Sequence, residues 1–430
     1  MKSERLDLFK DLAYDVLSIN RLTGTEGHKR AHKLIESFLE QLSCPYEKET
    51  FFVNRCIPKE AWIEVEGERI DCVAYIGSKE IEKEAYVKRE YWEGDIALIP
   101  DLTRDKAFEA QKRGAIAILT YREEALDGYV YGCYTGLDIP ILSLQREHVS
   151  KVEDYRIKLF VKSKEETVQG QNWIMEIGRG PVIYLIAHMD TVHSVYGAMD
   201  NGVAFLFLLF LYEELRERYN TPYRLRFLIS DARELGLEGV RHHLKKEPRH
   251  VYYCINLEGI GWYNPCVIYE DSGGYNGERI NQLFYKHVED LKMPIEFRRA
   301  KDLDGDHIPF KEKGVQSLFL TSHPFTLNRS SEGVKLKDTL TNSTVVLIPS
   351  FSSTFILFIS PLCETSTKTF EKYSSFTFGF RINTFPSAFS TSPKSWKTSA
   401  IGLDTKNSAS ITGELFLSRL STKAVLSLGE

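Results

Sequence analysis

The sequence predicts an α/β protein with a doubly wound, mixed but mostly parallel sheet and a smaller inserted β-rich domain. Five apolar runs between 181 and 321 read as strands: VIYLIA (182–187), RLRFLIS (224–230), VYYCINL (251–257), CVIYE (266–270) and SLFLT (317–321). Near-continuous apolar strands are typical of a sheet that is covered on both faces. Helical segments at about 202–218, 236–245, 276–291 and 308–313 lie between several of them, which indicates a doubly wound arrangement.

Length and composition indicate a soluble protein of about two domains. The 430 residues carry a net charge of -5, so we expect neither nucleic acid nor a membrane as partner, and no pattern predicts an oligomeric state. The charged N-terminus lacks the apolar segment of a signal peptide. The 7 cysteines are scattered without a CxxC pair, which favours reduced thiols in a cytoplasmic protein over disulfides.

Changes in residue composition and hydrophobic pattern divide the chain into four parts. Residues 1–45 read as two amphipathic helices, which we assign to the same domain as the main sheet. Residues 50–165 alternate short strands with charged turns, and we interpret them as an inserted apical domain. Residues 166–327 hold the main sheet.

The tail, 328–430, is rich in Ser and Thr, poor in acids and without a sustained period. Such a segment is a poor candidate for a packed domain, although it is more apolar than typical disordered chains. Two hypotheses remain: a divergent or disordered extension, or an out-of-frame translation joined to a truncated domain. Sequencing the gene across codons 323–340 separates them.

Polar side chains follow the predicted strands at the edge where open α/β sheets place their sites. His188 and Asp190 end the first strand, and Asp200 precedes the apolar helix that follows. The next two strands end near Glu234 and Glu258. Each residue alone has a structural interpretation, such as a helix N-cap for Asp200. Together, one imidazole and several carboxylates suit zinc, with cobalt or manganese as alternatives.

Further polar residues lie near the last strand. Asp306 and His307 precede it, and His323 follows it. By contrast, His242, His243 and His250 stand among Lys and Arg, and we expect them at the surface.

The motifs AHMDTV, GAMDNGVA, ARELGLEG and NLEGIG, in that order, resemble the co-catalytic di-zinc aminopeptidases. Relatives of that zinc-exopeptidase, phosphorylase/hydrolase-like family include bacterial leucyl aminopeptidase, glutamate carboxypeptidase, glutaminyl cyclase and the transferrin receptor. The stretch from Glu93 to Glu124 resembles the protease-associated domain, which shapes access to the active site in such enzymes.

The resemblance implies two zinc ions and hydrolysis of peptides at their N-terminal end. It implies that His188 and Glu258 bind one metal, that Glu234 binds the other, and that Asp200 bridges both. Asp190 would orient His188. Asp306 and His307 would lie near the substrate.

Two positions depart from the family pattern. The residue before the metal-binding Glu is normally a second Glu, the general base, whereas this chain has Arg233. A guanidinium cannot accept a proton at neutral pH. Asp231 and Glu238 are the acids nearby that could replace it. The last ligand is normally a His, but the corresponding segment has Val334, so His323 becomes the default candidate.

Three functions are compatible with this pattern. The first is a metal-dependent aminopeptidase, impaired by Arg233. The second is an inactive relative that serves as a binding or scaffold module. The third, glutaminyl cyclisation at one zinc, is disfavoured because its acid at position 233 is also missing.

Overall fold

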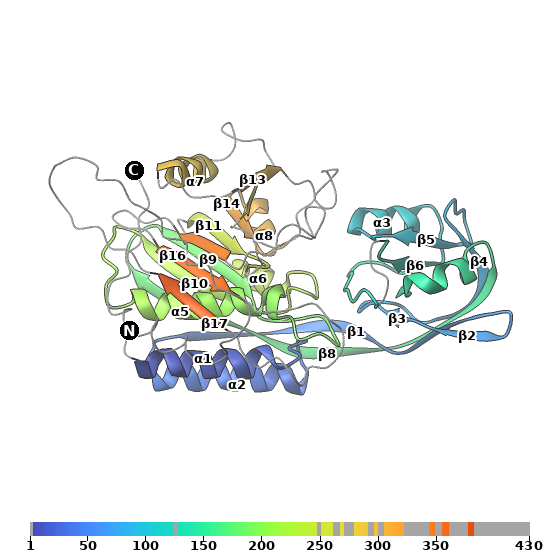
Figure 1. Ribbon diagram of the computed structural model, residues 1–430, viewed down its shortest axis with the longest axis horizontal. Coiled ribbons are helices and arrows are strands. Elements are labelled where there is room, and N and C mark those ends of the chain that lie inside the picture. Colours follow the sequence, from blue (N-terminus) through green and yellow to red (C-terminus); the bar gives the residue numbers. More distant parts are fainter. Residues whose placement is uncertain are drawn as a thin grey trace, which may run out of the picture.

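The computed structural model consists of two bodies joined by a long two-stranded ribbon (Figure 1). It describes residues 3–123, 128–246, 251–260, 267–270, 279–290, 296–299, 305–321, 344–348, 355–360 and 377–381. The larger body contains the catalytic sheet, and the smaller one is the apical domain. Among the described residues, no helix has the length and apolar character needed to cross a membrane.

The catalytic sheet is mixed and mostly parallel, in the strand order β13-β12-β14-β11-β9-β10-β8. Its strands are β8 (Arg156–Gly178), β9 (Val182–His188), β10 (Arg224–Ser230), β11 (Val251–Leu257), β12 (Val267–Glu270), β13 (Glu296–Arg299) and β14 (Gln316–Thr321). Strands β10, β9, β11 and β14 pair in parallel, whereas β8 and β12 join them antiparallel. The predicted fold class is confirmed. Strand β13, which is short and charged, was not predicted.

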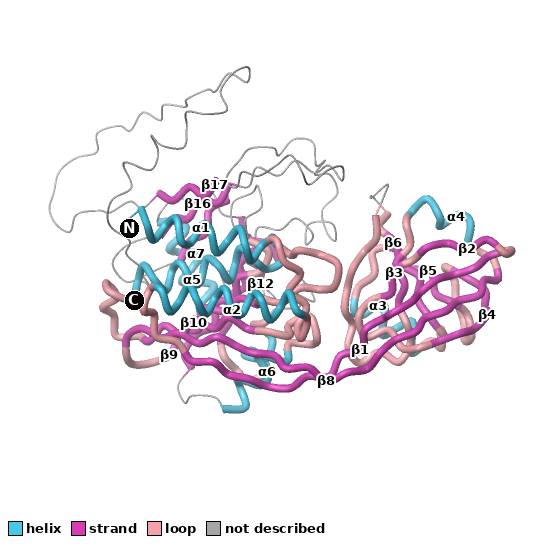
Figure 2. The backbone as a smooth tube through the Cα atoms, turned by 90° about the horizontal axis from the view of Figure 1, so that it is seen from below, coloured by secondary structure: helices cyan, strands magenta, loops and turns pink. Residues whose placement is uncertain are grey.

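Helices cover both faces of this sheet (Figure 2). One face carries α1 (Ser3–Leu17), α2 (Glu26–Gln41), α5 (Val203–Leu215) and α7 (Arg279–Asp290), whose apolar residues share one core. The other face carries α6 (Glu238–His243) and α8 (Ile308–Glu312). Helix α5 is buried along its whole length. This explains why its sequence is apolar on every side rather than amphipathic.

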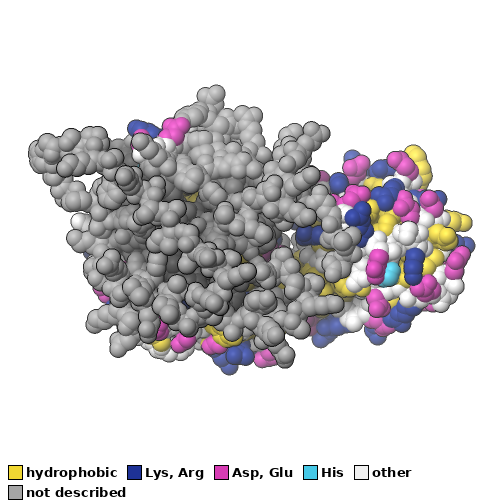
Figure 3. Space-filling view, in the orientation of Figure 1, with side chains coloured by type: hydrophobic (Ala, Val, Ile, Leu, Met, Phe, Trp, Pro, Cys, Tyr) yellow, Lys and Arg dark blue, Asp and Glu magenta, His cyan; other side chains and the backbone are white. Residues whose placement is uncertain are grey.

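The apical domain has its own sheet and core. Its elements are β2 (Glu68–Asp71), β3 (Val73–Ala74), β4 (Ile81–Lys88), β5 (Ile96–Pro100), α3 (Arg104–Lys112), β6 (Ala117–Tyr121), β7 (Ile141–Ser143) and α4 (Val149–Val152). The order of the strands in this sheet is β4-β5-β6-β7-β3. Basic and acidic side chains alternate over the face of this domain seen in Figure 3.

The ribbon between the two bodies pairs β1 (Glu47–Val65) with β8 in antiparallel register from Glu47↔Ile174 to Glu64↔Lys158. One end of β8 pairs with β10 in the catalytic sheet, and the other end pairs with β4 in the apical sheet. The predicted domain boundary at 165/166 therefore falls inside a continuous strand. Many side chains of the ribbon are exposed, which is why it lacks the apolar runs that marked the other strands.

In the tail, β15 (Thr344–Ile348), β16 (Phe355–Ser360) and β17 (Thr377–Arg381) form a separate antiparallel sheet. The rest of the tail and His323 lie outside the described residues. The origin of the tail stays a hypothesis.

His243 is buried, so its predicted surface position is wrong. Its ring nitrogens lie 2.9 Å from the Tyr184 hydroxyl and 3.1 Å from a Glu49 carboxylate oxygen. These partners come from β9 and β1, and a local pattern of charged neighbours could not reveal them. His250 lies outside the described residues.

Phe227 and Phe52 provide a matched test of the core. Phe227 in β10 is fully buried, whereas Phe52 in β1 is 77% exposed. We expect Phe227→Ala to lower the free energy of unfolding by about 3–5 kcal/mol, because it removes a buried ring and leaves a cavity. Phe52→Ala should change it by less than about 0.5 kcal/mol. Urea unfolding measures both, and equal effects would contradict the assigned core.

Candidate metal centre

The structure brings His188, Asp200, Glu234 and Glu258 together at the carboxyl edge of the sheet. His188 is the last residue of β9, and Glu258 directly follows β11. His188, Asp200 and Glu234 each offer an atom within 4.8 Å of the other two. His188 Nε2 lies 3.2 Å from Asp200 Oδ1 and 3.3 Å from Glu258 Oε1. These are four of the five ligands that the resemblance implies.

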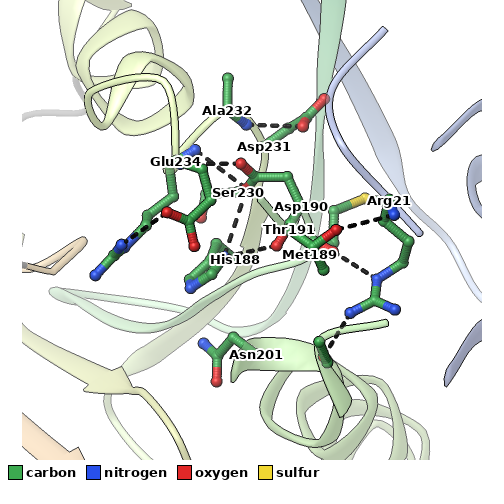
Figure 4. A network of polar contacts seen from close by, with 12 residues as sticks. Arg21, His188, Met189, Asp190, Thr191, Asn201, Ser230, Asp231, Ala232 and Glu234 are labelled. Atoms are coloured by element: carbon green, nitrogen blue, oxygen red, sulfur yellow. Dashed lines mark hydrogen bonds and ion pairs between the residues drawn. The ribbon is translucent and has the colours of Figure 1, made fainter. Parts of the chain in front are cut away.

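His188 lies between Asp190 and the Glu234 loop (Figure 4), and its Nε2 faces the carboxylates of Asp200 and Glu258. Its Nδ1 lies 3.1 Å from the backbone oxygen of Asp190, which can only accept, so Nδ1 carries a proton. The buried Nε2 has no hydrogen-bond partner among the described residues and faces the carboxylates. A metal-binding histidine is normally held by a hydrogen bond from its other ring nitrogen to a carbonyl or a carboxylate. The residues present therefore fit a divalent cation.

Asp190 holds the loop that carries Glu234. Its carboxylate accepts hydrogen bonds from the backbone N–H of Arg233, at 3.1 Å, and of Glu234, at 2.9 Å. Its Oδ1 is 3.5 Å from His188 Nδ1, farther than its own backbone oxygen. Asp190 thus holds the Glu234 loop and also lies close to His188. Its predicted role of orienting the His188 ring stays a prediction.

The loop that leads to Asp200 is fixed by two residues that sequence reasoning missed. The buried Arg21 guanidinium donates to the carbonyls of Met189, Tyr196 and Gly197 at 2.7–2.8 Å. Asn20 donates to two further carbonyls in the same loop. Burial lowers the pKa of Arg21 to about 10, although Asp190 and Asp200 oppose this shift. Asn20 and Arg21 are adjacent polar residues in the break between α1 and α2, and this was the signal that could have identified them.

Two asparagines position Glu258. Asn201 donates to the Leu257 carbonyl at 2.8 Å and accepts from the Gly259 N–H at 3.0 Å, so it holds the backbone on both sides of Glu258. Asn256 donates to Glu258 Oε2 at 3.1 Å. Asn201 directly follows Asp200 in the motif GAMDNGVA, which was the signal that could have identified it.

Arg233 points into the carboxylate cluster. Its Nη2 lies 2.8 Å from Glu258 Oε1, and its Nη1 lies 3.2 Å from Glu234 Oε2. The residue at the general-base position is therefore an ion-pair partner of two of the implied metal ligands.

Burial and the Arg233 guanidinium shift the pKa values of the groups in the centre. Burial raises the pKa of Glu234 to about 7, and Arg233 opposes this rise. Burial acts to raise the pKa of Glu258 as well, but Arg233 and His188 hold it below its usual value. Burial alone would lower the pKa of His188, yet Glu258 and its neighbours raise it well above the usual value.

Asp306 and His307 lie beside the centre and are buried. The Ser230 hydroxyl at the end of β10 donates to Asp306, and burial raises the pKa of this carboxyl to about 7. The His307 ring packs against Phe319 with ring centroids 5.1 Å apart. Their predicted contact with substrate stays a prediction. The structure does not describe His323.

A second cluster has metal-like spacing but the wrong proton arrangement. It consists of His28 and His32 on α2 and Asp231 after β10. Nδ1 of His32 accepts from the Trp173 indole N–H at 2.8 Å, and Nδ1 of His28 accepts from the Gly24 N–H at 3.2 Å. A neutral ring that accepts at Nδ1 carries its proton on Nε2. Both Nε2 atoms face Asp231 Oδ2, at 2.7 and 3.6 Å, so N–H groups point to where a metal would need lone pairs.

The apical domain reaches the loop that carries Glu234. A Cβ atom on Gly236 would lie 2.8 Å from the Thr135 hydroxyl oxygen, so only glycine fits this approach. Between these segments lies a cavity of about 580 Å³ that is lined by Arg55, Thr135 and Leu235. The cavity therefore adjoins the residue that follows Glu234.

Comparisons with known proteins agree with this geometry. Residues 172–338 match the model of peptidase family M28. The predicted relationship to the zinc exopeptidases is confirmed. The match includes Val334, so the family segment continues past the expected boundary at 327.

Relatives cover both bodies of the chain. Aminopeptidase YwaD from Bacillus subtilis is 25% identical over 341 residues, which are 71% of this chain and 73% of the relative. A vacuolar membrane protease from Candida tropicalis is 24% identical, but the match spans 19% of that protein. Solved structures with the same fold include an aminopeptidase from Aneurinibacillus sp. strain AM-1, at TM-score 0.59 and 18% identity, covering 74% of this chain and 85% of that one. The zinc aminopeptidase BSAP from Bacillus subtilis has TM-score 0.59, 21% identity and coverage of 76% and 87%.

Asp231 should make the stability of the fold depend on pH. Burial alone would raise the pKa of this carboxyl, but His28 and the other hydrogen-bond donors hold it well below its usual value. A carboxyl with a depressed pKa in the folded state stabilises the fold above the pKa of the unfolded chain, about 4, and this contribution is lost as the pH falls further.

We therefore expect Asp231→Asn to lower the free energy of unfolding by about 2–4 kcal/mol at pH 7. The difference from wild type should shrink as the pH falls below about 4. Urea unfolding between pH 3 and pH 7 measures this. Asp7→Asn, at a side chain that is 65% exposed, is the control. A difference that stays constant with pH would contradict the assigned role of Asp231 as a buried, ionised hydrogen-bond acceptor.

Proposed function

We propose that this chain is a zinc aminopeptidase that removes N-terminal residues from peptides at a centre of two metal ions. The proposal rests on one observation: His188, Asp200, Glu234 and Glu258 converge, with Nε2 of His188 3.2 Å from Asp200 Oδ1 and 3.3 Å from Glu258 Oε1. The family match and the relationship to YwaD support peptide substrates. The free state of the five described cysteines supports a reducing compartment such as the cytoplasm.

Four described side chains would hold the ions, and His323, outside the described residues, stays the predicted fifth ligand. His188 and Glu258 would bind one, Glu234 would bind the other, and Asp200 would bridge both. When bound, the ions supply Lewis-acid polarisation of the scissile carbonyl and a more acidic water. The chain itself fixes the ligands: Asp190 holds the backbone of the loop before Glu234, and Asn201 holds the backbone around Glu258.

Asp231 cannot replace the missing base. Its Oδ1 accepts from the Thr23 hydroxyl and the Ala232 N–H, and its Oδ2 accepts from His28 and the Gln171 N–H. Both oxygens are therefore saturated with donors, away from the cluster around His188. Glu238, the other acid considered for this role, stays a candidate for the general base. We accordingly propose a turnover below that of enzymes that carry Glu at position 233.

A non-catalytic binding module is the alternative, and one observation favours it. Arg233 pairs with Glu234 and Glu258 and so supplies positive charge where a metal would lie. Metal binding without hydrolysis would support this alternative.

Metal content and hydrolysis decide between the two functions. We expect about two zinc ions per chain by plasma mass spectrometry, together with chelator-sensitive release of nitroaniline from aminoacyl-nitroanilides. His188→Ala should lose zinc and activity, because it removes the buried nitrogen ligand. His148→Ala, in the apical domain, is the control and should retain both. If the wild-type protein contained no zinc after supplementation with metal, the proposal would be wrong.

Arg233→Glu tests the position of the base. If the ligands are in place, a carboxylate at 233 should raise kcat by about 10²-fold or more, because general-base catalysis typically contributes 10²–10⁴-fold. Nitroanilide kinetics on the zinc-loaded variant measure the gain. A variant that holds its zinc and gains nothing would show that position 233 does not face the reacting water.

A further inference from the structure

Arg233 occupies the carboxylates that the proposed function assigns to metal. Its two terminal nitrogens contact different ligands, Glu258 at 2.8 Å and Glu234 at 3.2 Å. Glu258 Oε1 is also the atom that lies 3.3 Å from His188 Nε2. One guanidinium therefore bridges the two sides of the cluster.

The surroundings of the cluster explain why a cation lies there. Glu234 and Glu258 have side chains only 9% and 3% exposed, and Asp190 is fully buried. Burying carboxylates without positive charge is unfavourable, so the fold needs a counter-charge when no metal is bound. A planar guanidinium that reaches two carboxylates at once meets this need better than an ammonium group.

The same charge opposes metal binding. A divalent cation and the guanidinium would compete for the same carboxylate oxygens, and they repel each other at short range. The backbone N–H of Arg233 is fixed on Asp190, so release of the carboxylates requires movement of the side chain alone. The side chain is 17% exposed, which gives it a path toward solvent.

We infer that Arg233 is a built-in competitor for the metal centre: its guanidinium stabilises the metal-free site and must leave Glu234 and Glu258 before both can bind metal. This inference rests on the proposed function, because it takes these glutamates as ligands. It goes further in assigning Arg233 a role in metal loading, separate from the missing base. The consequence is a centre whose metal affinity is set by one side chain outside the ligand set.

The test compares wild type, Arg233→Met and Arg241→Met with zinc alone as the probe. Met removes the charge and keeps an unbranched apolar side chain. Arg241 is the matched control, because it pairs with Glu312 at the surface and its side chain is 40% exposed. Proteins stripped with a chelator are melted with and without zinc, and zinc affinity is measured by calorimetry against a competing chelator.

The inference predicts a crossed result. Without zinc, Arg233→Met should melt below wild type, because Glu234 and Glu258 lose their counter-charge. With zinc, the same variant should bind at least about tenfold more tightly and show the larger rise in melting temperature. Arg241→Met should match wild type in zinc affinity. Arg233→Lys, which keeps the charge but not the two-carboxylate bridge, should lie between wild type and Arg233→Met, and it serves if the Met variant does not fold.

Two outcomes overturn the inference in distinguishable ways. Equal zinc affinity in wild type and Arg233→Met would show that the guanidinium does not compete, and would leave the proposed centre intact. No zinc binding by any folded protein in the set would remove the metal centre itself, and the competitor role with it.

Discussion

The constraint that governs this molecule is the need for positive charge among carboxylates gathered at one edge of a buried sheet. Parallel strands β9, β10 and β11 end at the same edge, so the acids that follow them meet around His188. In this structure the charge comes from Arg233 and from His188, whose pKa is raised well above its usual value even though burial acts against it. A metal centre would satisfy the same need with different charges. Exchange between the two is what the proposed metal loading requires.

Hydrogen-bond direction, more than spacing, separates the two His-carboxylate clusters of this chain. Nδ1 of His188 donates to a carbonyl, so Nε2 is the ring nitrogen that can give up its proton and bind a cation in the cluster. In His28 and His32 the same ring nitrogen accepts from an N–H group, so Nε2 carries the proton toward Asp231. The first cluster suits a cation. The second is a structural network that ties α2 to the strand leading into the Glu234 loop.

Much of this centre could be predicted from the sequence, because strands buried on both faces leave apolar runs and their ends are marked by the first polar residue. His188 and Glu258 were found in this way. The residues that hold the ligands were missed for a physical reason. Arg21 donates hydrogen bonds to carbonyls about 170 residues away in the chain, and the residues next to it in the sequence give no indication of these partners. The ribbon of β1 and β8 was not predicted, because many of its side chains are exposed and strands of this kind leave no apolar runs in the sequence.

The supporting hydrogen bonds also explain how one substitution can change the chemistry while the fold persists. Asp190 holds the backbone N–H groups of residues 233 and 234, and these bonds do not depend on the side chain at 233. Asn201 likewise binds only backbone atoms around Glu258. The positions of the ligand-bearing segments are thus separated from the charge of residue 233. A carboxylate there would add a proton acceptor, and the arginine present instead adds a cation, on the same scaffold. If these residues bind metal as proposed, the charge at position 233, rather than the geometry of the ligands, would decide whether this centre favours metal-dependent hydrolysis or a metal-free ion-pair cluster.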